Sequence, residues 1–131
     1  MKGILLMSHG ELAKGMMNTV SLFFGNLEKM DYLCLYQDDN PDEFKMKIQE
    51  RLNALDDGDG VLIIGDIIGG TPLNQAVYFA NEKVIILGGM NLGMLLEVMA
   101  NRESKDIDWN QIIESAKSGI HNLNQLLGVS S

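Results

Sequence analysis

The stretch Gly65-Asp66-Ile67-Ile68-Gly69-Gly70-Thr71-Pro72 decides the fold, because the segments on its two sides have different periodicity. The four residues before it, Val61–Ile64, are all apolar, as is typical of a strand buried on both faces of a parallel sheet. After it, Thr71 can cap a helix and Pro72 suits its first position. Apolar residues then recur at helical spacing, at positions 73, 76, 77 and 80. An acidic residue and a glycine pair therefore occupy a strand-to-helix turn, where α/β proteins place ligand sites.

The same strand-to-helix pattern recurs on both sides of this stretch. Short apolar runs predict further strands at residues 3–7, 32–35 and 84–87. Helices are predicted to begin near Glu11, Pro41, Asn91 and Asp108. Asn40, Asn91 and Asp108 are residue types whose side chains cap helices. The alternation predicts a three-layer α/β sandwich around a parallel sheet with right-handed crossovers.

The chain has a length suited to one domain, residues 1–131, with a full core. We expect the strand order 2-1-3-4, with the first strand in the centre of the sheet. The tail at residues 120–127 is apolar and fits either a short helix or an edge strand. Its leucines need a surface to cover, either on their own domain or on a partner subunit.

The composition limits the partners and the compartment. A net charge of −8 argues against nucleic acid and anionic membranes; it favours a basic partner or simply keeps the protein in solution. The apolar runs are too short for a membrane span, and the N-terminus lacks the features of a signal peptide, so we expect a cytoplasmic protein. The single Cys34 lies in an apolar run and is expected to be a buried thiol.

Two polar residues follow predicted neighbouring strands. His9 comes after the first strand and Asp66 after the third, so they can meet outside the carboxyl ends of the sheet. A carboxylate beside an imidazole holds one tautomer and leaves the other ring nitrogen free as a nucleophile or base. The amides of Gly69, Gly70 and Thr71 at a helix start, with the Thr71 hydroxyl, form a natural anion site. This combination predicts phosphoryl transfer.

Other chemistries lack their required parts. The stretch 65–71 has no Lys before its Thr, as a P-loop would, and no Gly-x-Gly-x-x-Gly spacing. Ser8 has no Gly-x-Ser-x-Gly elbow and points away from its neighbour on an extended segment. His9 and His121 are far apart in sequence and show no metal-ligand spacing. We therefore expect no metal and no cofactor, and a structural role for His121.

Less specific roles remain for each candidate residue. His9 could be an ordinary surface residue, Asp66 could form an Asx turn, and Thr71 could be only a helix cap. A signalling receiver domain phosphorylated on Asp66 would share the fold, but it needs an acidic pair for Mg²⁺ where this chain has Ser8-His9. A flavodoxin-like flavin site is disfavoured, because the loops after the first and third strands contain no Trp or Tyr.

Two motifs together resemble a known family. Residues 3–13, GILLMSHGELA, and residues 65–74, GDIIGGTPLN, are similar to the mannose-family (mannose/fructose/sorbose) IIA component of the bacterial phosphoenolpyruvate-dependent sugar phosphotransferase system (PTS). The similarity spans nearly the whole chain, including residues 89–92 and 119–120. The two motifs are specific in combination and less so singly.

The resemblance implies a phosphocarrier. His9 would accept a phosphoryl group from the phosphohistidine of the carrier HPr and pass it to a IIB component, which serves the membrane subunits IIC and IID. Asp66 would orient the ring through one nitrogen, while Thr71 and the helix amides, including that of Gly70, would hold the phosphate. No metal or nucleotide is required for such a transfer.

The resemblance also implies an assembly. Family members are homodimers that exchange a C-terminal antiparallel edge strand, a role that residues 120–127 would take. We expect a free-standing IIA protein with IIB on another chain. The transported sugar is not encoded in these residues.

Overall fold

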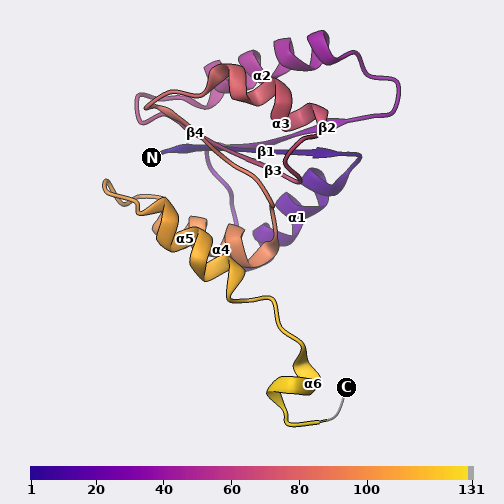
Figure 1. The fold of residues 1–131 in the computed structure, drawn as a ribbon. Coiled ribbons are helices and arrows are strands. Elements are labelled where there is room, and N and C mark those ends of the chain that lie inside the picture. The colour runs from indigo at the N-terminus through magenta and orange to yellow at the C-terminus, as the bar shows by residue number, and fades with distance from the viewer. Residues whose placement is uncertain (130–131) are drawn as a thin grey trace.

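In the computed structural model of the protein, which describes residues 1–129, four parallel strands form a sheet between two layers of helices (Figure 1). The strands lie in the order β2-β1-β3-β4, and each neighbouring pair is parallel. The predicted three-layer fold and strand order are therefore confirmed. The elements in chain order are β1 (Gly3–His9), α1 (Leu12–Phe24), β2 (Met30–Leu35), α2 (Pro41–Leu55), β3 (Val61–Gly65), α3 (Thr71–Ala76), η1 (Val77–Phe79), β4 (Val84–Leu87), α4 (Leu92–Asn101), α5 (Trp109–Lys117) and α6 (Leu123–Leu126).

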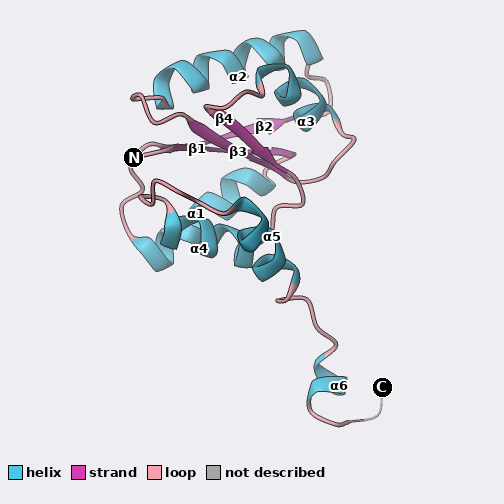
Figure 2. Ribbon diagram, turned by 60° about the vertical axis from the view of Figure 1, so that its left-hand side comes forward, coloured by secondary structure: helices cyan, strands magenta, loops and turns pink. Residues whose placement is uncertain are grey.

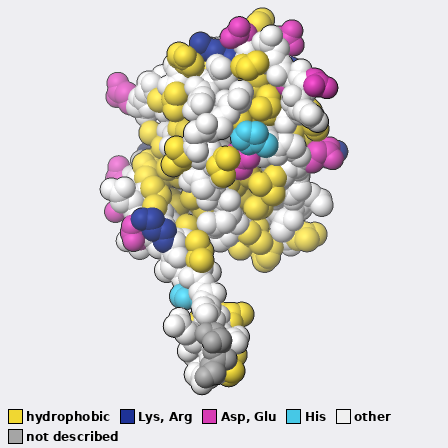
Figure 3. Space-filling model, turned by 45° about the vertical axis from the view of Figure 1, so that its right-hand side comes forward, with side chains coloured by type: hydrophobic (Ala, Val, Ile, Leu, Met, Phe, Trp, Pro, Cys, Tyr) yellow, Lys and Arg dark blue, Asp and Glu magenta, His cyan; other side chains and the backbone are white. Residues whose placement is uncertain are grey.

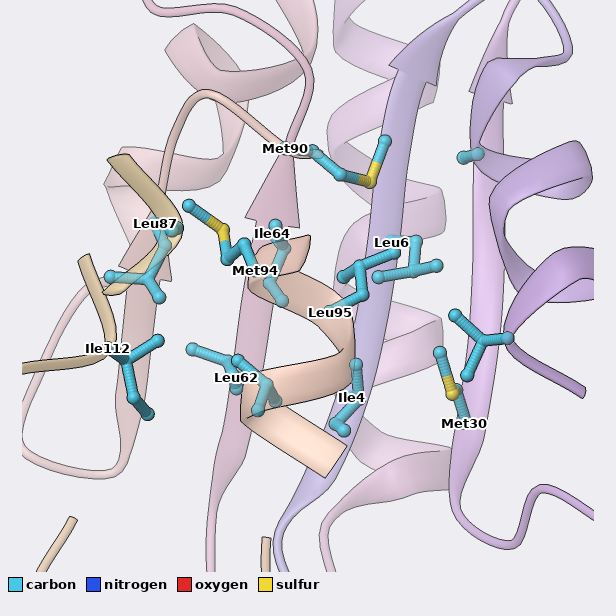
Figure 4. Packing of buried hydrophobic residues seen from close by; sticks show 14 of the residues in the cluster. Ile4, Leu6, Met30, Leu62, Ile64, Leu87, Met90, Met94, Leu95 and Ile112 are labelled. Atoms are coloured by element: carbon cyan, nitrogen blue, oxygen red, sulfur yellow. The ribbon is translucent and has the colours of Figure 1, made fainter. Parts of the chain in front are cut away.

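Alternate residues of the central strand β1 face the two helical layers, so the sheet separates two cores. Leu5 and Met7 belong to the core between the sheet and helices α2 and α3. Ile4 and Leu6 belong to the core between the sheet and helices α1, α4 and α5. All four side chains are almost fully buried, which explains why β1 is apolar at consecutive positions. Figure 4 shows the second core, with side chains of α4 packed across the strands.

Most helix starts follow the prediction, but α3 does not. Three predicted caps accept a backbone N–H of the first helical turn through their side chains: Asn40, Asn91 and Asp108. In α3 the N-cap is Gly70, and Thr71 is already helical, so the prediction of Thr71 as the cap is wrong by one position. The turn comes one residue earlier because Gly69 has a φ of 93°, a conformation that favours glycine.

Helix α3 is also shorter than predicted. It ends at Ala76 and continues as the 3₁₀ turn η1. A 3₁₀ helix has three residues per turn instead of 3.6, so the side chains after Ala76 leave the apolar face. Val77 is 57% exposed and Ala80 is exposed, so their assignment to the buried stripe is wrong, whereas Leu73 is buried as predicted.

The chain after α5 extends away from the domain (Figures 1 and 2). Residues 123–126 form the single-turn helix α6, so the described single chain has no edge strand there. Four apolar side chains of this segment are 63–77% exposed: Ile120, Leu123, Leu126 and Leu127. Among residues 1–129, each helix is too short or too polar to cross a membrane.

Candidate active site

The adjacent ends of β1 and β3 bring His9 and Asp66 together. His9 is the last residue of β1, Asp66 directly follows β3, and Met7 lies opposite Gly65 in the register of the two strands. The ring Nδ1 of His9 is 2.9 Å from Asp66 Oδ2, and the backbone N–H of His9 donates to the same oxygen at 2.9 Å. One carboxylate therefore holds both the backbone and the ring of His9.

Hydrogen bonds keep the Asp66 carboxylate ionised. Its side chain is 10% exposed, and burial by itself would raise its pKa. Hydrogen bonds from the backbone and ring of His9 and from the backbone N–H of Ile67 outweigh this and lower the pKa of Asp66 below its usual value. An ionised carboxylate only accepts hydrogen bonds, so Nδ1 of His9 carries the proton and Nε2 of the neutral ring has a free lone pair.

Gly70 lies against the His9 ring. A Cβ atom at position 70 would come within 2.4 Å of Cε1 and 2.9 Å of Nε2. Carbon atoms in nonbonded contact are roughly 3.5–4.0 Å apart, so a side chain at this position would displace the ring. The ring edge with the free lone pair therefore lies beside the start of α3.

Backbone donors surround this turn. The first intrahelical bond of α3 runs from the N–H of Asn74 to the carbonyl of Gly70 at 3.0 Å, so the N–H groups of Thr71 and Leu73 precede it. Such N-terminal groups carry the positive end of the helix dipole. The Asn74 side chain also donates to the carbonyl of Gly69 at 3.3 Å, which ties the glycine turn to α3. Thr71 thus follows directly on the residue that contacts the His9 ring.

Ser8 has a structural role that the sequence did not indicate. Its side chain is fully buried, and its Oγ donates to the carbonyl of Gly10 at 2.9 Å and accepts from the N–H of Ala13 at 2.8 Å. This pair of bonds joins the end of β1 to α1, since Glu11 at the cap position makes no side-chain cap bond. The usual cap spacing is two or three residues, so the spacing of five from Ser8 to Ala13 gave no recognisable signal.

The His9 imidazole is 45% exposed and has apolar neighbours in the adjoining loops. Four apolar side chains that follow the carboxyl ends of β1, β2 and β3 are 47–84% exposed: Leu12, Tyr36, Ile67 and Ile68. Figure 3 shows hydrophobic side chains around the exposed histidine of the domain. Clustered exposed apolar side chains mark interaction surfaces. Within residues 1–129, no three His, Cys, Asp or Glu side chains converge as metal ligands would.

Comparison with known families agrees with this geometry. The sequence model of the family described as "PTS system fructose IIA component" matches residues 3–116, which is most of the chain. The chain belongs to this PTS IIA family. The resemblance drawn from the two motifs is therefore confirmed.

The curated relatives of this IIA chain differ in how much of their length the match covers. The PTS system fructose-specific EIIA component of Bacillus subtilis (strain 168) is 27% identical over 105 residues, which cover 79% of this chain and 72% of that protein. The PTS system mannose-specific EIIAB component of Escherichia coli (strain K12) is 25% identical over 123 residues, 89% of this chain. The match spans only 38% of that longer relative.

A solved structure has the same fold throughout. The PTS IIA protein associated with the fucose utilization operon from Streptococcus pneumoniae superposes with a TM-score of 0.89 and 30% identity, over 96% of both chains. The mannose/sorbose specific IIA subunit from Enterococcus faecalis, at 22% identity, has a TM-score of 0.79 and supports the fold alone.

Proposed function

We propose that His9 is the phosphorylated residue of this IIA component and that Nε2 carries the phosphoryl group. The observation that carries this proposal is the hydrogen bond of 2.9 Å between His9 Nδ1 and Asp66 Oδ2. It fixes the tautomer in which Nε2 has a free lone pair, so Nε2 can attack phosphorus without first losing a proton. His9 and Asp66 are therefore the catalytic pair.

The proposed donor is the phosphohistidine of HPr, and the proposed acceptor is a IIB component. As the Nε2–P bond forms, the P–N bond of the donor breaks, and the donor imidazole leaves with its electron pair. Asp66 stabilises the positive charge that the His9 ring acquires. The amides of Gly70 and Thr71, with the Thr71 hydroxyl and the positive end of α3, hold the phosphate oxygens. Alignment and charge compensation suffice for this exchange, so it needs no metal or nucleotide.

We place this single phosphocarrier domain, residues 1–131, in the cytoplasm, where IIB passes the phosphoryl group on to the sugar carried by IIC and IID. The net charge of −8 favours a donor with a positive surface. The exposed apolar residues around His9 supply contact area for such a protein. The residues that select the sugar belong to the other components.

Phosphorylation by phosphoenolpyruvate, enzyme I and HPr tests this proposal. We expect a label that survives alkali and is lost in acid, as phosphohistidine does. The label should be absent from His9→Ala and unchanged in His121→Ala, the matched control. Label that His9→Ala still accepts from HPr would contradict the assignment. An alkali-labile label would indicate an acyl phosphate on Asp66, although three N–H groups already occupy that carboxylate.

We also propose a homodimer in which residues 120–127 add to β4 of a second copy as an exchanged edge strand. Their apolar side chains are exposed in the single chain, and β4 pairs with β3 on one side only among the described residues. A one-turn helix such as α6 has little stability alone, so its conversion to a strand costs little. Sedimentation should show a dimer that Leu123→Asp with Leu126→Asp dissociates. A monomeric wild-type protein at micromolar concentration would exclude the exchange.

A further inference from the structure

A mainly apolar groove, here called the edge groove, runs from the loop before α3 to the free edge of the sheet. It has a volume of about 470 Å³. One end is lined by Ile68, Gly69 and Asn74, and the other by Val77, Val84 and Ile86. Cavities of this size hold a substantial ligand or peptide segment. The edge groove thus connects the β4 edge with the surroundings of the candidate active site.

One wall of the edge groove is the loop that contacts the His9 ring. Ile68 is 84% exposed, yet its side chain lies over Gly88, where a Cβ would be 2.6 Å from Ile68 Cγ1. The next residue, Gly69, is held to α3 by the 3.3 Å hydrogen bond from Asn74. Gly70 then contacts His9. A molecule that packs in the groove therefore acts on this loop within two residues of the imidazole contact.

The chain itself carries a segment that matches the edge groove in chemistry. Residues 120–127, Ile-His-Asn-Leu-Asn-Gln-Leu-Leu, contain no acidic residue, lysine or arginine, and the groove is likewise lined without charged side chains. The segment projects away from its own domain (Figure 2), so a second copy is the natural acceptor. A twofold exchange covers both surfaces on both copies.

We infer that the C-terminal segment of a second copy completes the active site of the first. By packing on Ile68 and Gly69, it holds residues 67–70 in the conformation that places Gly70 and Thr71 beside His9. With the edge groove empty, this glycine-containing loop populates other conformations, and the productive fraction falls. The inference rests on the proposed function and dimer, and adds that phosphoryl transfer is coupled to association.

Full-length variants on both sides of the contact test the coupling. Leu123→Asp with Leu126→Asp alters the segment, and Val77→Asp alters the groove, at an exposed position where the domain tolerates charge. Each should slow phosphorylation of His9 by HPr about 10-fold, as expected if the productive conformation falls to about a tenth of the molecules. Leu22→Asp, at an exposed leucine of α1 outside both surfaces, is the matched control and should leave the rate unchanged.

Mixing protomers separates this effect from loss of folding. The Leu123→Asp, Leu126→Asp variant retains His9 and lacks a competent segment, whereas His9→Ala cannot be phosphorylated but carries an intact one. An excess of His9→Ala should restore the rate of the first variant toward that of the wild type. Absence of restoration, or a monomeric variant that is phosphorylated at the wild-type rate, would overturn the inference. If wild-type His9 accepts no phosphate, the proposed function fails instead.

Discussion

Replacing Gly70 with alanine tests whether the position of the His9 ring controls phosphorylation. The backbone at residue 70 has φ −92° and ψ 165°, which alanine adopts without strain, so only the added Cβ matters. That atom would lie 2.4 Å from Cε1 and 2.9 Å from Nε2 of His9. The ring must move by roughly 1 Å to restore a normal contact. Such a shift breaks the 2.9 Å hydrogen bond to Asp66.

The expected loss of rate follows from that hydrogen bond. A hydrogen bond to a charged group contributes about 1.5–3 kcal/mol, and each 1.4 kcal/mol corresponds to about tenfold in rate. Phosphorylation of Gly70→Ala should therefore be about 10- to 100-fold slower. The free energy of unfolding should fall by no more than the lost hydrogen bond, about 1.5–3 kcal/mol, partly offset by about 0.4–1 kcal/mol because alanine restricts the unfolded chain. A cooperative unfolding transition that stays above the assay temperature excludes misfolding as the cause of the slower phosphorylation.

Single-turnover phosphorylation by HPr measures the rate, and ¹⁵N NMR of the imidazoles reports the ring. The chain has two histidines, so His121 serves as an internal reference in the same spectrum. Gly15→Ala is the matched control, because Gly15 lies inside α1 with no atom within 4 Å of an added Cβ. It should stabilise the protein by about 1 kcal/mol without changing the rate. A wild-type rate in Gly70→Ala, or a slow rate with unchanged His9 signals, would refute the reasoning.

Three further variants test the interactions around the site and beneath the sheet. Hydrogen bonds lower the pKa of Asp66 in the folded state, so its contribution to stability is present above pH ~4 and is lost on further acidification. In an acid titration, the free energy of unfolding of Asp66→Asn should therefore fall less than that of the wild type. Ser8→Ala leaves the Ala13 N–H unpaired in a buried place and should lower the free energy of unfolding by about 1–3 kcal/mol in urea titration. Arg102→Met removes a buried guanidinium that donates to two backbone carbonyls. The free energy of unfolding should fall by about 3 kcal/mol, which is measured as a lower melting temperature. An unchanged melting temperature would show that water replaces these bonds.

Local sequence signals were sufficient for the framework and for the central pair. Apolar runs such as Val61–Ile64 are typical of strands buried on both faces, and this burial requires helices on both sides of the sheet. Polar residues at the ends of adjacent parallel strands must share one edge, which is why His9 and Asp66 could be paired before their distance was known. Caps such as Asn40 depend on the two or three residues that follow, so they too are local.

The remaining features depend on contacts between distant residues. The cap of α3 falls on Gly70, which contacts a histidine from another strand, and nothing in the Gly-Gly-Thr-Pro order shows that contact. Arg102 bonds the carbonyls of Lys2 and Lys29, 100 and 73 residues away, so its burial could not be foreseen from its polar neighbours. In the proposed dimer, the conformation of residues 120–127 depends on a second copy, which a single chain cannot supply.

The candidate site is divided between the end of β1 and the loop before α3, and this division determines which step dimer association can control. His9 lies in a strand, and its backbone and ring are both fixed by Asp66, so the imidazole keeps its tautomer in a single chain. Gly70 and Thr71, which we propose hold the phosphate, follow Gly69 with its positive φ, and Ile68 in the same loop is exposed. A disturbance of the C-terminal segment should therefore weaken phosphate binding and leave the His9 Nδ1 proton signal intact, whereas Gly70→Ala alters both. Rate loss with an unchanged imidazole is thus the signature of the dimer contact, and rate loss with a changed imidazole is the signature of a displaced ring.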